Sequence, residues 1–164
     1  MRKFWQIWLM LLGNGMVVVG LAMMLAPLSV VFQPLNDGAF ARFFGAAAAP
    51  PEALAYHSFL FGLLGAATVG WGLLVFFVAW KPFARGEAWS WVALAASTGV
   101  WFVLDTARIM IDGVTPYLLF NLAVVIAAAL PLIATCRPML AGTKVASAAS
   151  RPDDFGIRSP SGSQ

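Results

Sequence analysis

The residues that could carry chemistry in this chain gather on one predicted helix. Asp105, Arg108 and Asp112 follow one another at spacings of three and four, so they share a helix face. Asp105 lies about 17 residues from the helix start at residue 88, which corresponds to about 26 Å along the axis. An ionisable side chain inside a membrane is costly unless it has a partner, and it marks a candidate functional site. We expect Arg108, one turn away, to be its counter-charge.

Two polar residues on neighbouring segments should reach the same level. Asp105 lies eight residues before Gly113 and Asn121 eight residues after it, so an antiparallel helix pair would bring them to equal depth. His57, near the outer end of an earlier apolar run, should lie near this level too. The candidate polar cluster is therefore Asp105, Arg108, Asn121, Asp112 and His57. Asp105, Arg108 and Asn121 form either a clamp that fixes the packing of the third and fourth spans, or a site at which Asp105 couples a proton or cation.

A catalytic role is the least favoured interpretation of this cluster. The sequence has no Gly-rich phosphate loop, no Ser-His-Asp arrangement and no paired carboxylates of a recognisable kind. It contains one Cys and one His, so it offers neither a thiolate metal site nor paired haem ligands. We expect no enzyme activity, no cofactor and no metal site.

Four apolar runs must position these residues. They cover residues 4–36, 58–80, 88–104 and 117–136, and the first contains no charged residue. A helix of about 20 apolar residues crosses the hydrocarbon core of a bilayer. Hydrophobic residues make up 61% of the chain and charged residues 10%, which excludes an ordinary soluble domain. We predict an all-α fold, an antiparallel bundle of four transmembrane helices at about 5–26, 57–80, 88–111 and 116–136, in a domain of residues 1–136.

Two segments outside these spans differ in composition. Pro27 and Pro34 should end the first helix, and residues 39–44, with Arg42, are typical of a short helix lying on the membrane interface. Pro51 and Glu52 suit the first turn of the second span, which we expect to begin outside the membrane. Residues 137–164 are rich in Ser, Ala, Gly and Pro, and we expect them to form a disordered cytoplasmic tail.

The basic residues predict the orientation of the bundle. Of the ten Lys and Arg, only Arg42 and Arg108 fall in the two connections on the second side. The other eight lie on the first side: Arg2, Lys3, Lys81, Arg85, Arg137, Lys144, Arg151 and Arg158. The positive-inside rule assigns that side, with both termini, to the cytoplasm. Because these residues are scattered rather than clustered, we expect the lipid bilayer and not a nucleic acid as the partner.

The second span carries a ridge of small residues at every fourth position, with Gly65 and Gly72 alongside. This small-residue ridge consists of Ser58, Gly62, Ala66 and Gly70. Small residues let helix backbones approach closely in lipid. The ridge packs either against the first span, which offers Gly13 and Gly20, or against a second copy of the chain as a homo-oligomer face.

Several pieces of the sequence carry a resemblance. They are Val69-Gly-Trp-Gly-Leu-Leu, Pro82-Phe-Ala-Arg-Gly-Glu-Ala-Trp-Ser-Trp and Val100-Trp-Phe-Val-Leu-Asp-Thr, followed by Asn121 and Pro131-Leu. Over about residues 58–135 the chain resembles small bacterial four-span membrane proteins of the BphX-like kind. The resemblance implies four helices in a bacterial inner membrane, and it brings no activity with it.

Three functional interpretations remain open from the sequence. The leading one is a non-enzymatic integral membrane protein that serves as an accessory or assembly subunit. The alternative is a small transporter or channel subunit that uses Asp105 for proton or cation coupling. The third is a membrane enzyme that acts on a lipid-soluble substrate.

Overall fold

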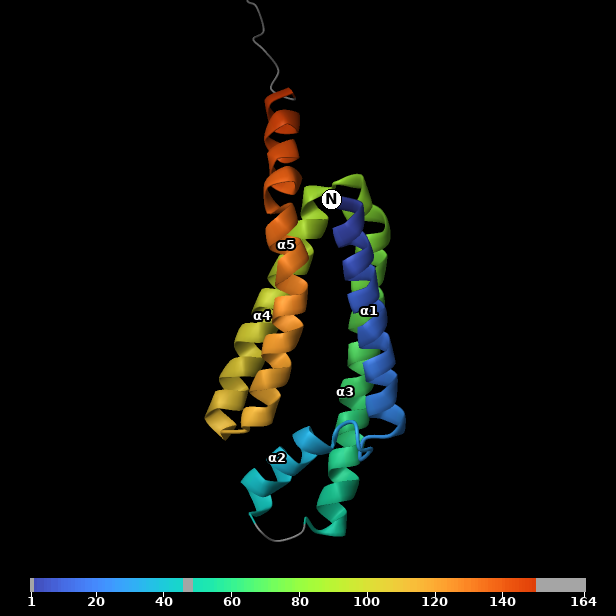
Figure 1. The fold of residues 1–164 in the computed structure, drawn as a ribbon, viewed down its shortest axis with the longest axis vertical. Coiled ribbons are helices and arrows are strands. Elements are labelled where there is room, and N and C mark those ends of the chain that lie inside the picture. Colours follow the sequence, from blue (N-terminus) through green and yellow to red (C-terminus); the bar gives the residue numbers. More distant parts are fainter. Residues whose placement is uncertain (1, 46–48, 150–164) are drawn as a thin grey trace, which may run out of the picture.

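The computed structural model describes residues 2–45 and 49–149, and these are helical almost throughout (Figure 1). The elements are α1 (Arg2–Leu25), α2 (Gln33–Phe44), α3 (Pro51–Val78), a π-helical turn η1 (Ala79–Phe83), α4 (Ala88–Asp112) and α5 (Thr115–Ala149). Four stretches are long and apolar enough to cross a membrane: Arg2–Leu25, Pro51–Phe83, Ala88–Asp112 and Thr115–Leu140. The all-α prediction is confirmed, and the chain is a multi-pass membrane protein.

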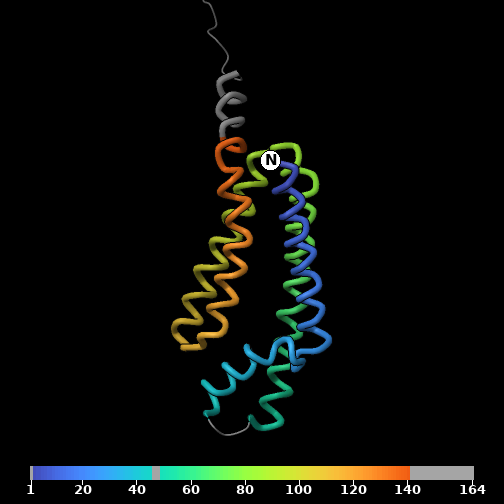
Figure 2. Tube along the Cα trace, in the orientation of Figure 1, coloured from blue at the N-terminus to red at the C-terminus, as the bar shows by residue number. Residues whose placement is uncertain are grey.

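The helices are arranged as two antiparallel pairs (Figure 2). In one pair α1 packs along α3, and in the other α4 packs along α5. The pairs meet where the N-terminus and η1 lie, which we call the junction end, and their axes diverge from there in this view. The short helix α2 lies at the opposite end, which we call the α2 end, where it contacts α5.

Four glycines bring α1 and α3 into close contact. A Cβ added to Gly13 would fall 2.7 Å from the carbonyl oxygen of Gly72, and one added to Gly20 would fall 2.6 Å from that of Gly65. Gly13 and Gly20 face α3 one heptad apart, as Gly65 and Gly72 face α1. Contacts this short leave no room for a side chain, so backbone packing holds this pair together.

The small-residue ridge takes little part in that interface, and its predicted packing against the first span is corrected. A Cβ added to Gly62 would approach only the carbonyl oxygen of Met24, at 4.0 Å, and one added to Gly70 would meet nothing within 4 Å. Ser58 and Gly62 are half-buried, while Ala66 and Gly70 are exposed. The physical reason is that residues seven apart stay on one face of a packed helix, and Gly65 and Gly72 lie on the face that contacts α1.

A core of buried apolar residues joins the two pairs at the junction end. We call it the junction core, and it consists of Leu9, Val75, Ala79, Phe83, Leu94, Leu132 and Met139. Ala79 and Phe83 lie in η1 and are fully buried. Pro82 within this turn has no N–H to donate, so a regular α-helix would lose a hydrogen bond there. The wider π-helical turn places both apolar side chains in the core.

Pro131 interrupts the hydrogen-bond ladder of α5, and a tryptophan from α1 makes use of the interruption. Without an N–H, Pro131 leaves the carbonyl oxygen of Ala127, four residues earlier, without its helical donor. The indole N–H of Trp8 donates to that oxygen at 2.8 Å. The indole N–H of Trp91 donates to the carbonyl oxygen of Leu132, also at 2.8 Å. These two bonds fasten α5 to α1 and to α4.

Two boundaries differ from those that the sequence predicted. The interface helix begins at Gln33 rather than residue 39, because Pro34 suits the first turn of a helix. The helix α5 continues to Ala149, so the prediction of a disordered tail from residue 137 is wrong for residues 137–149. Met139 is 1% exposed in the junction core, which carries the helix past Pro138. The expected disorder of residues 150–164 falls outside the described residues.

Candidate functional site

The centre of the candidate site is a hydrogen bond between α4 and α5. The amide Nδ2 of Asn121 donates to the Oδ2 of Asp105 at 2.6 Å. Asn121 is 2% exposed, whereas Asp105 is half-buried. The tight turn at Gly113, where φ is +73°, sets the two helices in register. The sequence predicted that Asp105 and Asn121 lie at one level because both are equally spaced from this glycine, and the structure brings them together.

Arg108 does not pair with Asp105, which corrects the expected counter-charge. Its Nε lies 2.8 Å from the Oδ2 of Asp112, one turn further along α4. The Arg108 side chain is 70% exposed, and that of Asp112 is 23% exposed. A long cationic side chain near a helix end reaches toward the membrane surface, where hydration is available, and the i, i+4 spacing offers Asp112 there. The ion pair is thus a surface feature of the α2 end.

His57 belongs to a different cluster, on the α1–α3 side of the molecule. Its Nε2 lies 3.0 Å from the Oδ1 of Asn36, and Asn36 donates through Nδ2 to the carbonyl oxygen of Pro27 at 2.9 Å. The ring of His57 also lies against the rings of Phe40 and Phe61. His57 therefore secures the connection between α1 and α2, and the structure does not bring it to Asp105.

The helix α2 connects the His57 cluster with the α4–α5 turn. Its residue Asn36 is 4% exposed and bonds His57, and its Arg42 donates through Nε to the carbonyl oxygen of Asp112 at 2.7 Å. Gly38 lies against the ring of Pro116, since an added Cβ would fall 2.6 Å from its Cγ. The α2 helix thus ties the two pairs at the end opposite the junction core.

Sequence reasoning missed Asn36 and Arg42 as structural residues. The available signal for Asn36 was an amide at the end of an uncharged apolar run, beside two prolines that leave carbonyl groups unpaired. For Arg42, the signal was an isolated basic residue on the side where basic residues are rare. Neither signal identifies the residue that the side chain bonds, because His57 and Asp112 lie on other helices.

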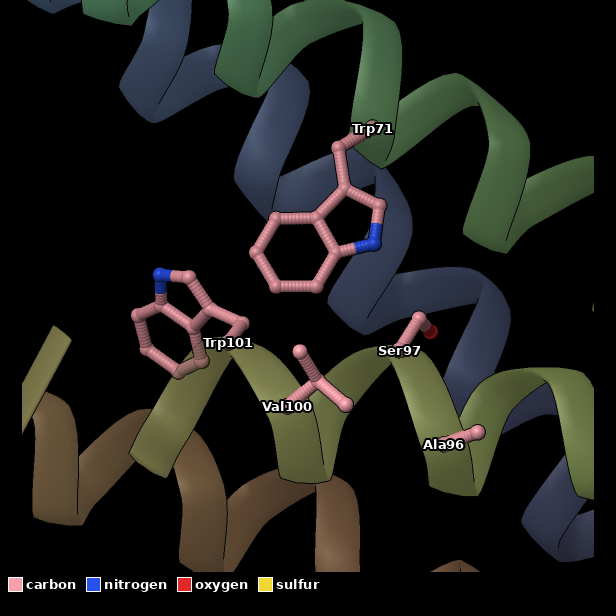
Figure 3. Close-up of a pocket in the computed structure, with 5 residues that line it drawn as sticks. All are labelled: Trp71, Ala96, Ser97, Val100 and Trp101. Atoms are coloured by element: carbon pink, nitrogen blue, oxygen red, sulfur yellow. The ribbon is translucent and has the colours of Figure 1, made fainter. Parts of the chain in front are cut away.

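A shallow cavity of about 480 Å³ lies between α3 and α4, and its lining ends at Trp101, one helical turn before Asp105 (Figure 3). It is lined by Trp71 of α3 and by Ala96, Ser97, Val100 and Trp101 of α4. The two indole rings lie 5.3 Å apart between centroids, with their planes at 62°, so an edge-to-face contact links the helices there. Asp105 is not among the lining residues.

The described residues contain no group of three or more His, Cys, Asp or Glu side chains that could hold a metal ion. No protein-family model, curated protein or solved structure matches this chain. The chemistry of the site therefore carries the functional argument by itself. That chemistry consists of one carboxylate bonded by a buried amide, and an ion pair nearer the helix end.

Proposed function

We propose that this chain is a non-enzymatic accessory or assembly subunit of a bacterial inner membrane, in keeping with its resemblance to BphX-like four-span proteins. The observation that carries the proposal is the bond from Asn121 to Asp105. A buried amide that donates to a carboxylate fixes the register of two neighbouring helices, and such polar contacts across membrane helices stabilise packing. The Asp105–Asn121 bond is in this sense a structural clamp between α4 and α5.

The lining of the cavity supports the same proposal. A transport site would be expected to place its ionisable group on a water-accessible route. The cavity between α3 and α4 is lined by apolar and aromatic side chains with one serine, whose Oγ donates to the carbonyl oxygen of Leu94 at 3.2 Å. Its lining does not reach Asp105.

One observation favours the alternative, a transporter or channel subunit that couples a proton or cation to Asp105. Because Arg108 pairs with Asp112, no ion pair to Asp105 is found among the described residues. The hydroxyl of the next residue, Thr106, is also buried with no hydrogen-bond partner in the described part of the chain. A carboxylate inside a membrane span without a counter-charge is a candidate coupling site.

Flux measurements separate these two functions. The purified chain is reconstituted into liposomes, and proton and monovalent cation flux is measured across imposed pH and potential gradients. We expect no flux above that of empty liposomes, and no difference between the natural chain and Asp105→Asn. The matched control is Asp112→Asn, which changes a carboxylate outside the clamp. A flux that Asp105→Asn abolishes and Asp112→Asn preserves would replace the accessory function with the coupling function.

We also propose that the junction end and both termini face the cytoplasm. Support comes from Arg2, Lys3, Lys81 and Arg85, which all lie at or beside the junction end. Reporter fusions in the connection at residues 84–87 should report a cytoplasmic position, and fusions after Gly113 should report the opposite side. A reversed pattern at these two positions would refute the orientation.

We further propose that copies of this chain assemble in the membrane. The small-residue ridge is one candidate face, since Ala66 and Gly70 are exposed and a Cβ at Gly70 would meet nothing within 4 Å. Small residues on an outward helix face permit close approach by a second helix in lipid.

A further inference from the structure

The outward face of α1 carries a polar residue, Asn14, that has no partner within residues 2–45 and 49–149. Asn14 lies 12 residues after Arg2, about 18 Å along a helix of 24 residues, so it falls near the middle of the span. Its side chain is exposed, and it makes no side-chain hydrogen bond within the described residues. In contrast Thr68, a polar residue of α3, donates to its own helix at the carbonyl oxygen of Leu64 at 2.8 Å.

The residues around Asn14 repeat at alternating spacings of three and four. They are Phe4, Ile7, Leu11, Asn14, Val18, Leu21 and Leu25, which we call the α1 seam. The six apolar members are all exposed, from 40% at Leu21 to 75% at Leu25. This spacing is the heptad pattern of two helices that pack side by side with a left-handed twist.

The α1 seam lies opposite the face that packs on α3. At 100° per residue, Gly13 and Gly20 centre on one side of the helix, and Leu11 and Val18 fall on the other. The seam is therefore free for a partner while the α1–α3 pair stays intact. It runs nearly the full length of α1, from Phe4 to Leu25.

We infer that the α1 seam is a contact surface for a second copy of this chain, with Asn14 facing Asn14 across a two-fold axis. An amide group has both a donor and an acceptor, so two identical amides satisfy each other with two hydrogen bonds. Two copies with the same orientation in the membrane are related by a two-fold axis that runs along the membrane normal. That symmetry places each seam residue opposite its own equivalent at the same depth.

Asn14 then sets the register of the pair. A single amide in an apolar heptad seam specifies which residues meet, because any shift leaves an amide unpaired in lipid. This inference deepens the assembly part of the proposed function and rests on it, but it does not depend on the role of Asp105. It assigns the contact to α1 rather than to the small-residue ridge of α3.

The first test measures dimerisation of the full chain in lipid bilayers by energy transfer between labelled copies over a range of dilutions. We expect Asn14→Leu to raise the dimer dissociation constant about five- to tenfold, the effect of losing two interhelical hydrogen bonds of the size found in membranes. Asn14→Gln, which keeps the amide, should recover part of the loss. The matched control is Thr68→Val, which removes a polar group that bonds within its own helix and should change nothing.

The second test maps the surface by cysteine cross-linking in a Cys136→Ser background. Leu11→Cys and Val18→Cys should each give cross-linked dimers under mild oxidation, whereas Leu63→Cys and Leu74→Cys, on the exposed face of α3, should not. Cross-linking through Ala66→Cys but not through Val18→Cys would assign the contact to the small-residue ridge and overturn the inference. A natural chain that stays monomeric at all dilutions would overturn it as well, and would leave the flux result on Asp105 standing.

Discussion

The indole N–H of Trp8 donates to the carbonyl oxygen of Ala127, which Pro131 leaves without a helical donor. A proline in one helix thus leaves free the acceptor that a second helix binds. Trp8 belongs to α1 and Ala127 to α5, so the bond links the α1–α3 pair with the α4–α5 pair. In an apolar medium an unpaired carbonyl is costly, and the contact is correspondingly valuable.

We expect Trp8→Phe to lower stability by at least about 1 kcal/mol, since the hydrogen bond is lost together with part of the packing surface of the ring. Thermal unfolding in one detergent measures the effect. Trp89→Phe is the control, because the indole of Trp89 bonds the carboxylate of Glu87 two residues away on an exposed surface. Pro131→Ala restores an N–H for Ala127, so Trp8→Phe should cost less in that background. An equal cost in both backgrounds would show that the value of the bond does not depend on the N–H that Pro131 lacks.

The close contact of α1 and α3 predicts opposite effects for two glycines of the same helix. Gly65→Ala would place a Cβ against the backbone of Gly20, and should destabilise the chain by about 1–3 kcal/mol. Gly70→Ala meets open space, and should stabilise the helix by up to about 1 kcal/mol. Thermal unfolding of both variants decides the point. Destabilisation by Gly70→Ala in the dispersed monomer would show that the ridge packs within the chain after all.

The Asp105–Asn121 bond should appear as a coupling between the two residues. Asp105→Leu leaves the buried amide of Asn121 without an acceptor, at a cost of about 1–3 kcal/mol. Adding Asn121→Leu removes the unpaired amide and should recover much of that loss. Asp105→Leu with Arg108→Leu should bring no recovery, because Arg108 bonds Asp112 instead. A full double-mutant cycle by thermal unfolding measures these terms, and additive effects of Asp105→Leu and Asn121→Leu would exclude the clamp.

The helix α2 should hold the two helix pairs together less firmly when its contact with the α4–α5 turn is removed. Arg42→Met keeps the apolar stem and loses the bond to the carbonyl oxygen of Asp112. We expect the amides of α2 to exchange hydrogen about three- to tenfold faster, corresponding to the loss of a single hydrogen bond. Exchange in α3 should be unchanged. The control is Arg85→Met, because Arg85 pairs at 3.5 Å with Glu87 at the junction end. Equal acceleration in both variants would mean that Arg42 does not hold α2.

The parts of the fold that the sequence predicted rest on length and counting. Apolar runs of bilayer length predict the four helices almost regardless of what surrounds them. Because the turn at Gly113 is tight, counting residues on either side of it is enough to predict that Asp105 and Asn121 meet. The boundary at residue 137 failed for a tertiary reason. Composition suggested disorder, but Met139 is buried in a core that local composition does not reveal.

The sequence could not show which residues contact one another across the fold. Arg108 had carboxylates one turn away in both directions, and only the position of the helix end decides between Asp105 and Asp112. The sequence placed His57 near Asp105 only because both residues were expected at the same depth in the membrane. In the structure α2 places Asn36 beside His57 instead. The helix α3 is apolar all round, so its sequence offers two sets of small residues, and the position of α1 selects Gly65 and Gly72.

The junction core has a consequence for the order in which the chain assembles. The α1–α3 pair is complete once residue 83 has entered the membrane, and the α4–α5 hairpin forms from contiguous residues. The junction core needs both Leu9, near the first residue, and Met139, near the last turn of the final span. It therefore closes only after the fourth span has entered the membrane. Until then the apolar faces of the two hairpins stay uncovered at the junction end, where a quality-control protease would find them.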